Sequence, residues 1–205
     1  MLPELTLTEL LEQTAAGTPV PGGGSLSALA AAMGAALTQM VAGLTIGRPQ
    51  YADADPAMQA LNAKAQRLRK DLLAAMDQDA GAYTAVMAAR KRPQATAPEK
   101  ARRNEAIQQA ICEAARVPLS MAEMALKVMA LAHTAIRQGN PNTLSDGAVG
   151  ALLARAALQG GIYNVRINLQ SIQDEDFRTR MLEKAAGLES RAAELDAAIR
   201  ADINL

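Results

Sequence analysis

Between Gln13 and Gly47 the sequence contains no charged residue, and alanine dominates the second half of this stretch. An uncharged run of this length is formally long enough to cross a membrane as a helix. Alanine and glycine are only weakly apolar, however, and polar residues such as Ser25 and Gln39 interrupt the run. A helix that is apolar on every side is otherwise one buried among other helices. We therefore expect a helix over residues 25–45 at the centre of a bundle or at a subunit interface, and no membrane span.

The rest of the sequence repeats apolar residues at helical spacing, and no segment alternates apolar and polar residues as a half-exposed strand would. Caps and breakers predict helices that begin near Thr6, at Pro56 with Asp55 as the N-cap, at the capping box of Thr96 and Glu99, at Ser145 or Asp146, and near Asp174–Asp176. Pro118 is expected to interrupt the helix that follows Thr96, or to start a new one. The prediction is an all-α fold, a single domain over residues 1–205 built as a bundle of six or seven helices with long antiparallel helices.

Charge and composition exclude several classes of function. Lysine plus arginine and aspartate plus glutamate both number 21, so there is no basic surplus for nucleic acid or an anionic membrane. Cys112 is the only cysteine in the sequence and His133 the only histidine, which excludes an internal disulfide framework and a His/Cys metal site. The N-terminus has no basic segment of the kind that opens a signal peptide. We expect a cytoplasmic protein.

Three glycines precede the uncharged helix, in the segment Pro21-Gly-Gly-Gly-Ser25. A buried helix needs one capping residue, for which Gly24 or Ser25 would serve, so the other glycines are unexplained. Without side chains they let a ligand reach the backbone N–H groups at the helix start. The segment lacks the Gly-Lys-Ser/Thr of a P-loop, and no strand precedes it as in a dinucleotide fingerprint. A plain glycine-rich turn and a ligand-binding loop both stay open.

Asp79 lies on the apolar stripe of the long third helix. At about 100° per residue, Leu72, Met76 and Tyr83 fall on the same line as Asp79, whereas Asp77 falls on the opposite face. A carboxylate that faces a core must be paired, hydrogen-bonded or protonated. Burial also raises its pKa, which suits a general acid or base. A catalytic role and a structural one, in which Asp79 caps or pairs with another helix, are equally consistent with the pattern.

Two further groups of polar residues stand out. Asn164 and Asn168 are four residues apart and share a helix face. Their amides could read the donor and acceptor edge of a heterocycle, or hydrogen-bond another helix, which is the commoner use. The loop from Gly139 to Asp146 offers polar side chains at a helix start, where capping is the simpler explanation.

Six segments of the chain match, in order, the motifs of one protein family. They are TPVPGGGSLSALAAAMGAAL, LTIGRPQY, DQDAGAY, ARVPLSMAE, GNPNTLSD and NVRINLQSIQD. In this combination the sequence resembles the cyclodeaminase/cyclohydrolase family of one-carbon folate metabolism, over nearly the whole chain. The resemblance implies an all-α protein that assembles as a homodimer or higher oligomer. It also implies a tetrahydrofolate derivative as small-molecule substrate, with no redox cofactor and no metal.

The resemblance also points to candidate site residues. We expect Asp79 to donate or accept a proton and Asp146 to orient water or the pterin ring. The candidate substrate-binding residues are Pro21, Gly22, Gly23, Gly24, Ser25, Arg48, Tyr83, Asn140, Asn142, Ser145, Asn164 and Asn168. Within this set, the two asparagines of one helix would hydrogen-bond the pterin edge, and the arginine would meet a carboxylate.

Two activities occur in the family, and the resemblance leaves both open. One is the hydrolysis of 5,10-methenyltetrahydrofolate to 10-formyltetrahydrofolate, and the other is the ring closure of formimidoyltetrahydrofolate with loss of ammonia. We expect the cyclohydrolase, because no formiminotransferase domain accompanies this chain. A non-catalytic folate-binding or structural oligomer is the third possibility. It is raised by two departures from the family pattern, Gln94 in place of a lysine and Gly81 in place of a frequent acidic residue.

Overall fold

The computed structural model describes residues 1–203, and every regular element in that part of the chain is helical. The elements are η1 (Leu2–Glu4), α1 (Leu7–Ala15), α2 (Gly23–Gly43), η2 (Pro49–Ala54), α3 (Asp55–Arg90), α4 (Ala97–Gln138), η3 (Pro141–Thr143), α5 (Leu144–Leu169) and α6 (Glu175–Asp202). The predicted all-α bundle with six or seven helices and long antiparallel helices is confirmed. The last two residues of the predicted domain, Asn204 and Leu205, lie outside the described residues.

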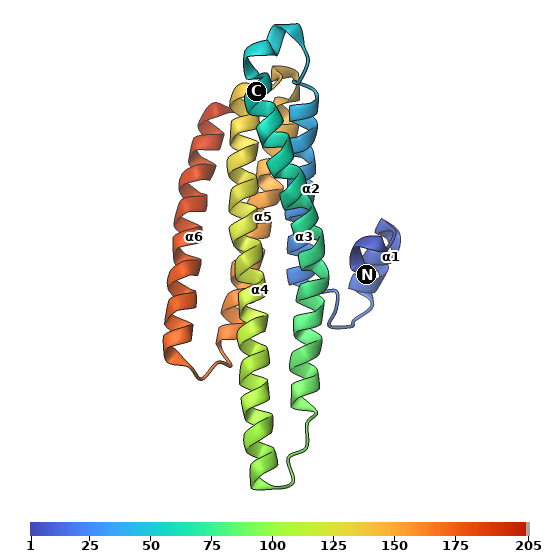
Figure 1. Cartoon of the computed structure of the whole chain (residues 1–205), viewed down its shortest axis with the longest axis vertical. Helices are drawn as coiled ribbons and strands as arrows, with labels where there is room; N and C mark the ends of the chain where they lie inside the picture. Colours follow the sequence, from blue (N-terminus) through green and yellow to red (C-terminus); the bar gives the residue numbers. More distant parts are fainter. Residues whose placement is uncertain (204–205) are drawn as a thin grey trace.

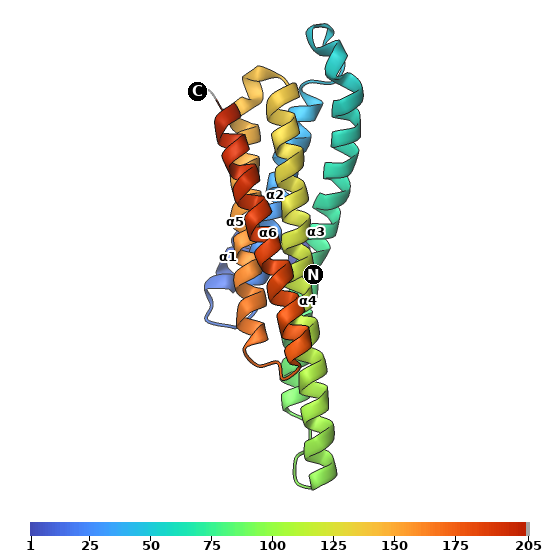
Figure 2. The same ribbon diagram turned by 90° about the vertical axis from the view of Figure 1, so that its left-hand side faces the viewer.

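The long helices α3 and α4 form an antiparallel hairpin whose tip extends beyond the other helices at one end of the molecule (Figure 1). Helices α2 and α5 lie behind this hairpin, and α6 packs against α4 and α5 (Figures 1 and 2). The short α1 lies to one side, near the start of α2 (Figure 1). The backbone N–H of Leu2 donates to Asp77 at 2.8 Å. Asp77, expected on a solvent-facing side of α3, is therefore partly buried.

Small residues let the helices approach closely. The main core cluster contains residues of α2, α3, α4, α5 and α6. Many of them are alanines, among them Ala32, Ala122 and Ala154. At the closest crossing, a Cβ on Gly34 would lie 2.6 Å from the carbonyl oxygen of Gly150. Position 34 must therefore be glycine for α2 and α5 to pack at this distance.

Helix α2 is packed against α3, α4 and α5, but one side of it faces solvent, where Met33 and Met40 are exposed. Within one chain, this helix is therefore buried by its neighbours on most sides and not on all of them. By length and hydropathy α2 and α4 could each span a membrane. In the apolar 18-residue segment of each helix that meets this test, however, 44% of the residues of α2 and 50% of those of α4 are buried inside the protein. Core helices of soluble proteins pass the same test, so this is weak evidence for a membrane.

Most of the predicted helix starts are confirmed, and two capping assignments are wrong. Thr6 caps α1, Thr96 and Glu99 form the capping box of α4, and Asp174 caps α6. The N-cap of α2 is Gly22, because the hydroxyl of Ser25 donates to other helical partners instead of capping. Asp55 does not cap α3, because its carboxylate accepts hydrogen bonds from the backbone N–H of Gly47, which has a positive φ of 73°.

Pro118 does not interrupt α4, contrary to the prediction. Proline has no N–H, so the carbonyl of Ala114, four residues earlier, loses its helical donor. The side-chain amide of Asn168 donates to this carbonyl at 2.7 Å and replaces the missing bond. Gly161 of α5 faces the same turn, where a Cβ would lie 2.9 Å from the carbonyl oxygen of Pro118. A long-range partner on α5 thus allows α4 to continue unbroken.

Candidate active site

A pocket of about 440 Å³ opens where the α3–α4 hairpin leaves the bundle. Its walls come from the start of α2, the second half of α3, the first half of α4 and the end of α5. The lining residues are Pro19, Val20, Gly22, Gly23, Gly24, Asp79, Ala82, Tyr83, Val86, Met87, Arg90, Ile111, Ala114, Asn164, Ile167, Asn168, Gln170 and Ser171. This volume falls in the range of small-molecule sites. Among the described residues of the lining, only Asp79 and Arg90 carry charge.

Asp79 projects from α3 toward the N-terminus of α2. The hydroxyl of Ser25 donates to Asp79 Oδ2 at 2.9 Å, and it also lies 3.0 Å from the carbonyl oxygen of Met76. The carboxylate fills the space beside Gly24, where a Cβ would come within 2.5 Å of the Asp79 Cγ. The first amides of a helix attract negative charge, so the glycines allow a carboxylate to approach them directly.

Burial is the main influence on the proton affinity of Asp79. Desolvation raises the pKa of this carboxyl above its ordinary value, and hydrogen bonds from the hydroxyl and the backbone of Ser25 act in the opposite direction. The burial effect is the larger of the two, so Asp79 holds a proton more tightly than an aspartate in water does. A carboxyl with a raised pKa, lining an open pocket, is able to exchange a proton with a bound ligand.

Asn164 and Asn168 of α5 line the same pocket as Asp79 of α3. The amide of Asn164 donates to the carbonyl of Gly160 on its own helix at 2.8 Å, and that of Asn168 to Ala114 on α4 at 2.7 Å. In each side chain one of the two amide N–H groups therefore donates to a backbone carbonyl. The side-chain oxygens are the groups left to accept hydrogen bonds from a ligand.

Arg90 is a pocket residue that the sequence reasoning missed. Its segment, Arg90 to Pro93, reads as a solvated helix end, but Arg90, the last residue of α3, lines the pocket. A usable signal was present: Arg90 lies 11 residues after Asp79, which is about three turns and returns to the same helix face. Tyr83, one turn after Asp79, lies between them and is half exposed.

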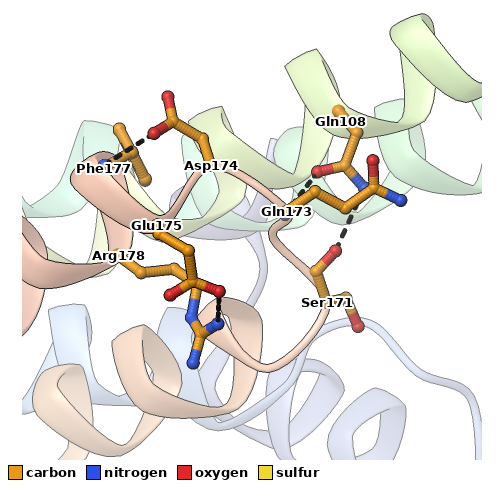
Figure 3. A network of polar contacts seen from close by, with 7 residues as sticks. All are labelled: Gln108, Ser171, Gln173, Asp174, Glu175, Phe177 and Arg178. Atoms are coloured by element: carbon orange, nitrogen blue, oxygen red, sulfur yellow. Dashed lines mark hydrogen bonds and ion pairs between the residues drawn. The ribbon is translucent and has the colours of Figure 1, made fainter.

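The turn between α5 and α6 forms one rim of the pocket through Ser171. Gln108 of α4 holds this turn at two points: its amide donates to the carbonyl of Ser171 at 3.1 Å, and its oxygen accepts from the N–H of Gln173 at 2.9 Å (Figure 3). Asp174 then caps α6 by accepting from the N–H of Phe177. The rim is therefore fixed to the base of the α3–α4 hairpin.

Pro21 is buried directly before the pocket residue Gly22. Five candidate residues lie at the opposite end of α2 and α5 and do not line this pocket, namely Arg48, Asn140, Asn142, Ser145 and Asp146. Asn140 is the centre of the group: its N–H donates to the buried Thr45 at 2.8 Å, and its side-chain oxygen accepts from the Tyr51 hydroxyl at 3.0 Å and from the N–H of Asn142 at 3.0 Å. Arg48 and Ser145 are exposed, and Asp146 is partly buried. At 1.5 Å per residue, Asp146 is about 27 Å along α5 from Asn164.

Neither Cys112 nor His133 lines the pocket. Cys112 is partly buried on α4, and burial raises the pKa of its thiol. His133 Nε2 lies 2.6 Å from Asp202 and joins α4 to the end of α6. Within residues 1–203, no three His, Cys, Asp or Glu side chains are grouped so as to hold a metal ion.

Comparison with known proteins gives consistent relatives. The chain is 36% identical over 191 residues to a methenyltetrahydrofolate cyclohydrolase of Methylorubrum extorquens, and the match covers 93% of this chain and 92% of the relative. It is 32% identical to the formimidoyltransferase-cyclodeaminase of Rattus norvegicus and 36% identical to that of Gallus gallus. In those two the match covers 34% and 32% of the relative, so the chain spans about a third of their length.

The fold has a close structural counterpart as well. The crystal structure of a formiminotetrahydrofolate cyclodeaminase from Thermotoga maritima superimposes with a TM-score of 0.89 at 30% identity, covering 98% of this chain and 97% of that one. The sequence model described as formiminotransferase-cyclodeaminase matches residues 6–187. These residues include every candidate site residue at both ends of α2 and α5. The chain therefore belongs to the formiminotransferase-cyclodeaminase family.

Proposed function

We propose that this protein is a cytoplasmic 5,10-methenyltetrahydrofolate cyclohydrolase in which Asp79 carries out the proton transfers. The observation that carries the proposal is the position of Asp79, a partly buried carboxyl with a raised pKa that faces an open pocket at the glycine-rich start of α2. The similarity to a cyclohydrolase over 93% of the chain supports the choice of substrate.

The reaction needs one base that later acts as an acid. Water adds its oxygen to the cationic carbon between N5 and N10 and gives one proton to the Asp79 carboxylate. The neutral adduct then breaks its bond to N5 as Asp79 returns a proton to that nitrogen. The hydroxyl proton leaves to solvent as the formyl C=O forms, so the net products are 10-formyltetrahydrofolate and one proton. A positioned carboxylate contributes about 10²- to 10⁴-fold to such a step.

Neighbouring groups would hold the substrate and the carboxylate. Ser25 positions Asp79 by its 2.9 Å hydrogen bond. The free side-chain oxygens of Asn164 and Asn168 would accept from the N–H edge of the pterin ring. Tyr83 would cover a ring face, and Arg90 would meet a carboxylate of the glutamate tail.

The cyclodeaminase is the second candidate, and one comparison favours it. The cyclodeaminase from Thermotoga maritima is a chain of matching extent, covered over 97% of its length. A domain standing alone therefore does not separate the two activities. In the cyclodeaminase reaction N10 attacks the formimidoyl carbon and ammonia leaves, and Asp79 would pass a proton from N10 to the departing nitrogen.

The test is to offer each substrate to the wild type and to two matched variants. The absorbance of methenyltetrahydrofolate follows hydrolysis, and release of ammonia from formimidoyltetrahydrofolate follows cyclodeamination. Asp79→Asn should lose about 10²- to 10⁴-fold in turnover with little change in KM. Asp77→Asn alters a carboxylate on the same helix that contacts only Leu2 among its described partners, and it should keep its activity.

Three other results would redirect the assignment. Ammonia release without hydrolysis would make the protein a cyclodeaminase. Binding of either folate without any turnover would favour the non-catalytic oligomer. Full turnover by a folded Asp79→Asn variant would remove Asp79 from the chemistry. We also propose that residues 1–205 form a single domain that assembles as a homo-oligomer, which sedimentation or light scattering would measure.

A further inference from the structure

The turn between α5 and α6, residues 170–174, brings two polar side chains to the pocket that are not among the candidate site residues. Gln170 and Ser171 both line the pocket, and both are exposed. In the described part of the chain, the Gln170 amide and the Ser171 hydroxyl make no hydrogen bond within the protein. These groups are therefore free to bind a ligand.

The turn is fixed to the bundle at several points. The N–H of Ser171 donates to the carbonyl of Asn168 at 3.3 Å, which ties the start of the turn to α5. Gln108 of α4 donates to the carbonyl of Ser171 at 3.1 Å and accepts from the N–H of Gln173 at 2.9 Å (Figure 3). Ile172, between these two contact points, is 3% exposed and packs in the main core cluster. Ile172 thus keeps the turn on the bundle, while Gln108 sets the direction of the peptide groups around it.

Gln108 lies midway along the pocket. Arg103 of α4 is level with Arg90 of α3, since its Nε donates to the Arg90 carbonyl at 2.9 Å. Because α3 and α4 are antiparallel, Ala114, eleven residues after Arg103, is level with Asp79, eleven residues before Arg90. Gln108 falls between Arg103 and Ala114 and is about 8 Å from the level of each, at 1.5 Å per residue. The turn therefore lies between the level of the proton-transferring carboxyl and that of the arginine.

We propose that Gln170 and Ser171 bind the amide that joins the aromatic ring of the folate to its glutamate, and that Gln108 positions both. Along its length the substrate carries the reacting carbon, the aromatic ring, this amide and then the carboxylates. With the reacting carbon at Asp79 and a carboxylate at Arg90, the amide lies at the level of the turn.

The chemistry of the two side chains matches an amide. The hydroxyl of Ser171 donates to the amide carbonyl oxygen, and the side-chain oxygen of Gln170 accepts from the amide N–H. Both bonds are made to a part of the substrate that does not react, so they contribute to binding rather than to the chemical step. This assignment rests on the proposed function, from which it takes the folate and its orientation.

The test compares two ligands that differ only in the amide and the glutamate. 5-Formyltetrahydrofolate contains both, whereas 5-formyltetrahydropteroate ends at the carboxyl group of the aromatic ring. Titration calorimetry gives the Kd of each ligand without any turnover. Gln170→Ala and Ser171→Ala should each weaken binding of the folate about 3- to 10-fold, because each removes one net hydrogen bond. Binding of the pteroate should not change.

The role of Gln108 is tested with a variant of similar length. Gln108→Met keeps the apolar stem of the side chain and removes both hydrogen bonds to the turn. It should weaken binding of the folate about 10-fold, with the affinity for the pteroate and the melting temperature close to those of the wild type. Gln109→Met is the matched control, because the Gln109 amide donates to Glu105 on its own helix at 3.3 Å. It should bind both ligands as the wild type does.

A coupling measurement separates positioning from a merely structural effect. Gln108 acts through Gln170 and Ser171, so Gln108→Met should add little further loss in a variant that carries alanine at both of those positions. Equal losses of Gln108→Met for the folate and the pteroate would show a general distortion of the pocket and overturn the proposal. Unchanged folate binding by the variant with both alanines would overturn it as well.

Turnover distinguishes failure of this proposal from failure of the proposed function. With methenyltetrahydrofolate, Gln108→Met should raise KM about 10-fold and leave kcat close to that of the wild type, as for a lost contact to a part that does not react. A wild type that turns over neither folate, but shows the ligand-dependent losses above, retains the turn as a folate-binding element and fails only the proposed function. A wild type that hydrolyses its substrate with equal losses for both ligands fails only the assignment of the turn. A wild type that binds neither ligand overturns both.

Discussion

The carboxylate of Asp79 occupies the space that a side chain at position 24 would need. A Cβ built on Gly24 would lie 2.5 Å from Asp79 Cγ and 2.6 Å from Oδ2, which is closer than real contacts allow. Glycine is required here by this close approach, since Gly24 does not have a positive φ. Gly24, the last of the three glycines, is therefore explained by an aspartate 55 residues later in the sequence. A change at either position should affect the other.

Replacing Gly24 by alanine should impair catalysis more than folding. The added methyl would push the Asp79 carboxylate away from Ser25, and the side chain can swing into the open pocket without disturbing the core. We expect turnover to fall about 10- to 100-fold, as for a misplaced catalytic group, with a melting temperature close to that of the wild type. Gly43→Ala is the control. Gly43 lies on the same helix as Gly24, and a Cβ at this position would meet nothing within 4 Å. Unchanged turnover in Gly24→Ala would contradict the role given to this approach.

The pH dependence of turnover should follow the raised pKa of Asp79. If the carboxylate is the base, activity rises with pH as Asp79 loses its proton, and burial places this rise above the range of an ordinary aspartate. Removing the Ser25 hydroxyl with Ser25→Ala deletes a hydrogen bond that lowers this pKa. The acid limb of a kcat/KM profile should therefore move to higher pH in Ser25→Ala. A limb that stays in place would separate Asp79 from the titration that controls the rate.

Stability should respond to the same group with a definite sign. Because the folded pKa of Asp79 is above its unfolded value, this residue favours folding below the unfolded pKa, and that contribution is lost as pH rises through the folded pKa. Asp79→Asn cannot ionise, so it should gain melting temperature relative to the wild type above this window and not below it. Thermal unfolding at two pH values on either side of the window measures the difference. Equal differences at both values would contradict the burial of the charge.

Local patterns in the sequence predicted most of the fold, because helix periodicity and caps act over a few residues. Helices begin beside Thr6 and Asp174 as expected, Thr96 forms the predicted capping box, and Asp79 and Tyr83 lie on one face of α3. Relationships between distant segments could not be predicted in this way. One example is the bond that Ser25 makes across to α3.

The division of the candidate residues into two groups has the same cause. Motif order along the chain says nothing about which helix ends meet, and only the packing of α2 on α5 shows that Asp79 and Asp146 belong to opposite ends. Pro118 was expected to break its helix because the rule that governs proline is local. Asn168, whose amide replaces the hydrogen bond that proline removes, lies 50 residues later in the chain. Its position depends on how α5 packs on α4.

Gly187 should be replaceable with a gain in stability. It lies in the interior of α6, a Cβ there meets nothing within 4 Å, and its φ is not positive. Alanine reduces the freedom of the unfolded chain, so Gly187→Ala should add about 0.5–1 kcal/mol to the free energy of unfolding. Gly34→Ala is the opposite control, because its Cβ would meet the Gly150 carbonyl oxygen at 2.6 Å and force α2 away from α5. Denaturant unfolding of both variants should give changes of opposite sign.

Asn168 and Pro118 should be coupled through the carbonyl of Ala114. Asn168→Ala leaves that buried acceptor without a donor, which should cost about 1–3 kcal/mol of unfolding free energy. In a Pro118→Ala background the new N–H of residue 118 can donate to the same carbonyl, so the cost of Asn168→Ala should fall below about 1 kcal/mol.

Asn164→Ala provides the control for this cycle. The amide of Asn164 donates to the Gly160 carbonyl, which lies on its own helix and already has a helical donor. Its removal should therefore cost the same with proline or alanine at position 118. Chemical denaturation of the four proteins in each cycle measures the coupling. If Asn168→Ala cost as much with alanine at 118 as with proline, the amide would not be replacing the bond that proline removes. The continuity of α4 through Pro118 would then need another explanation.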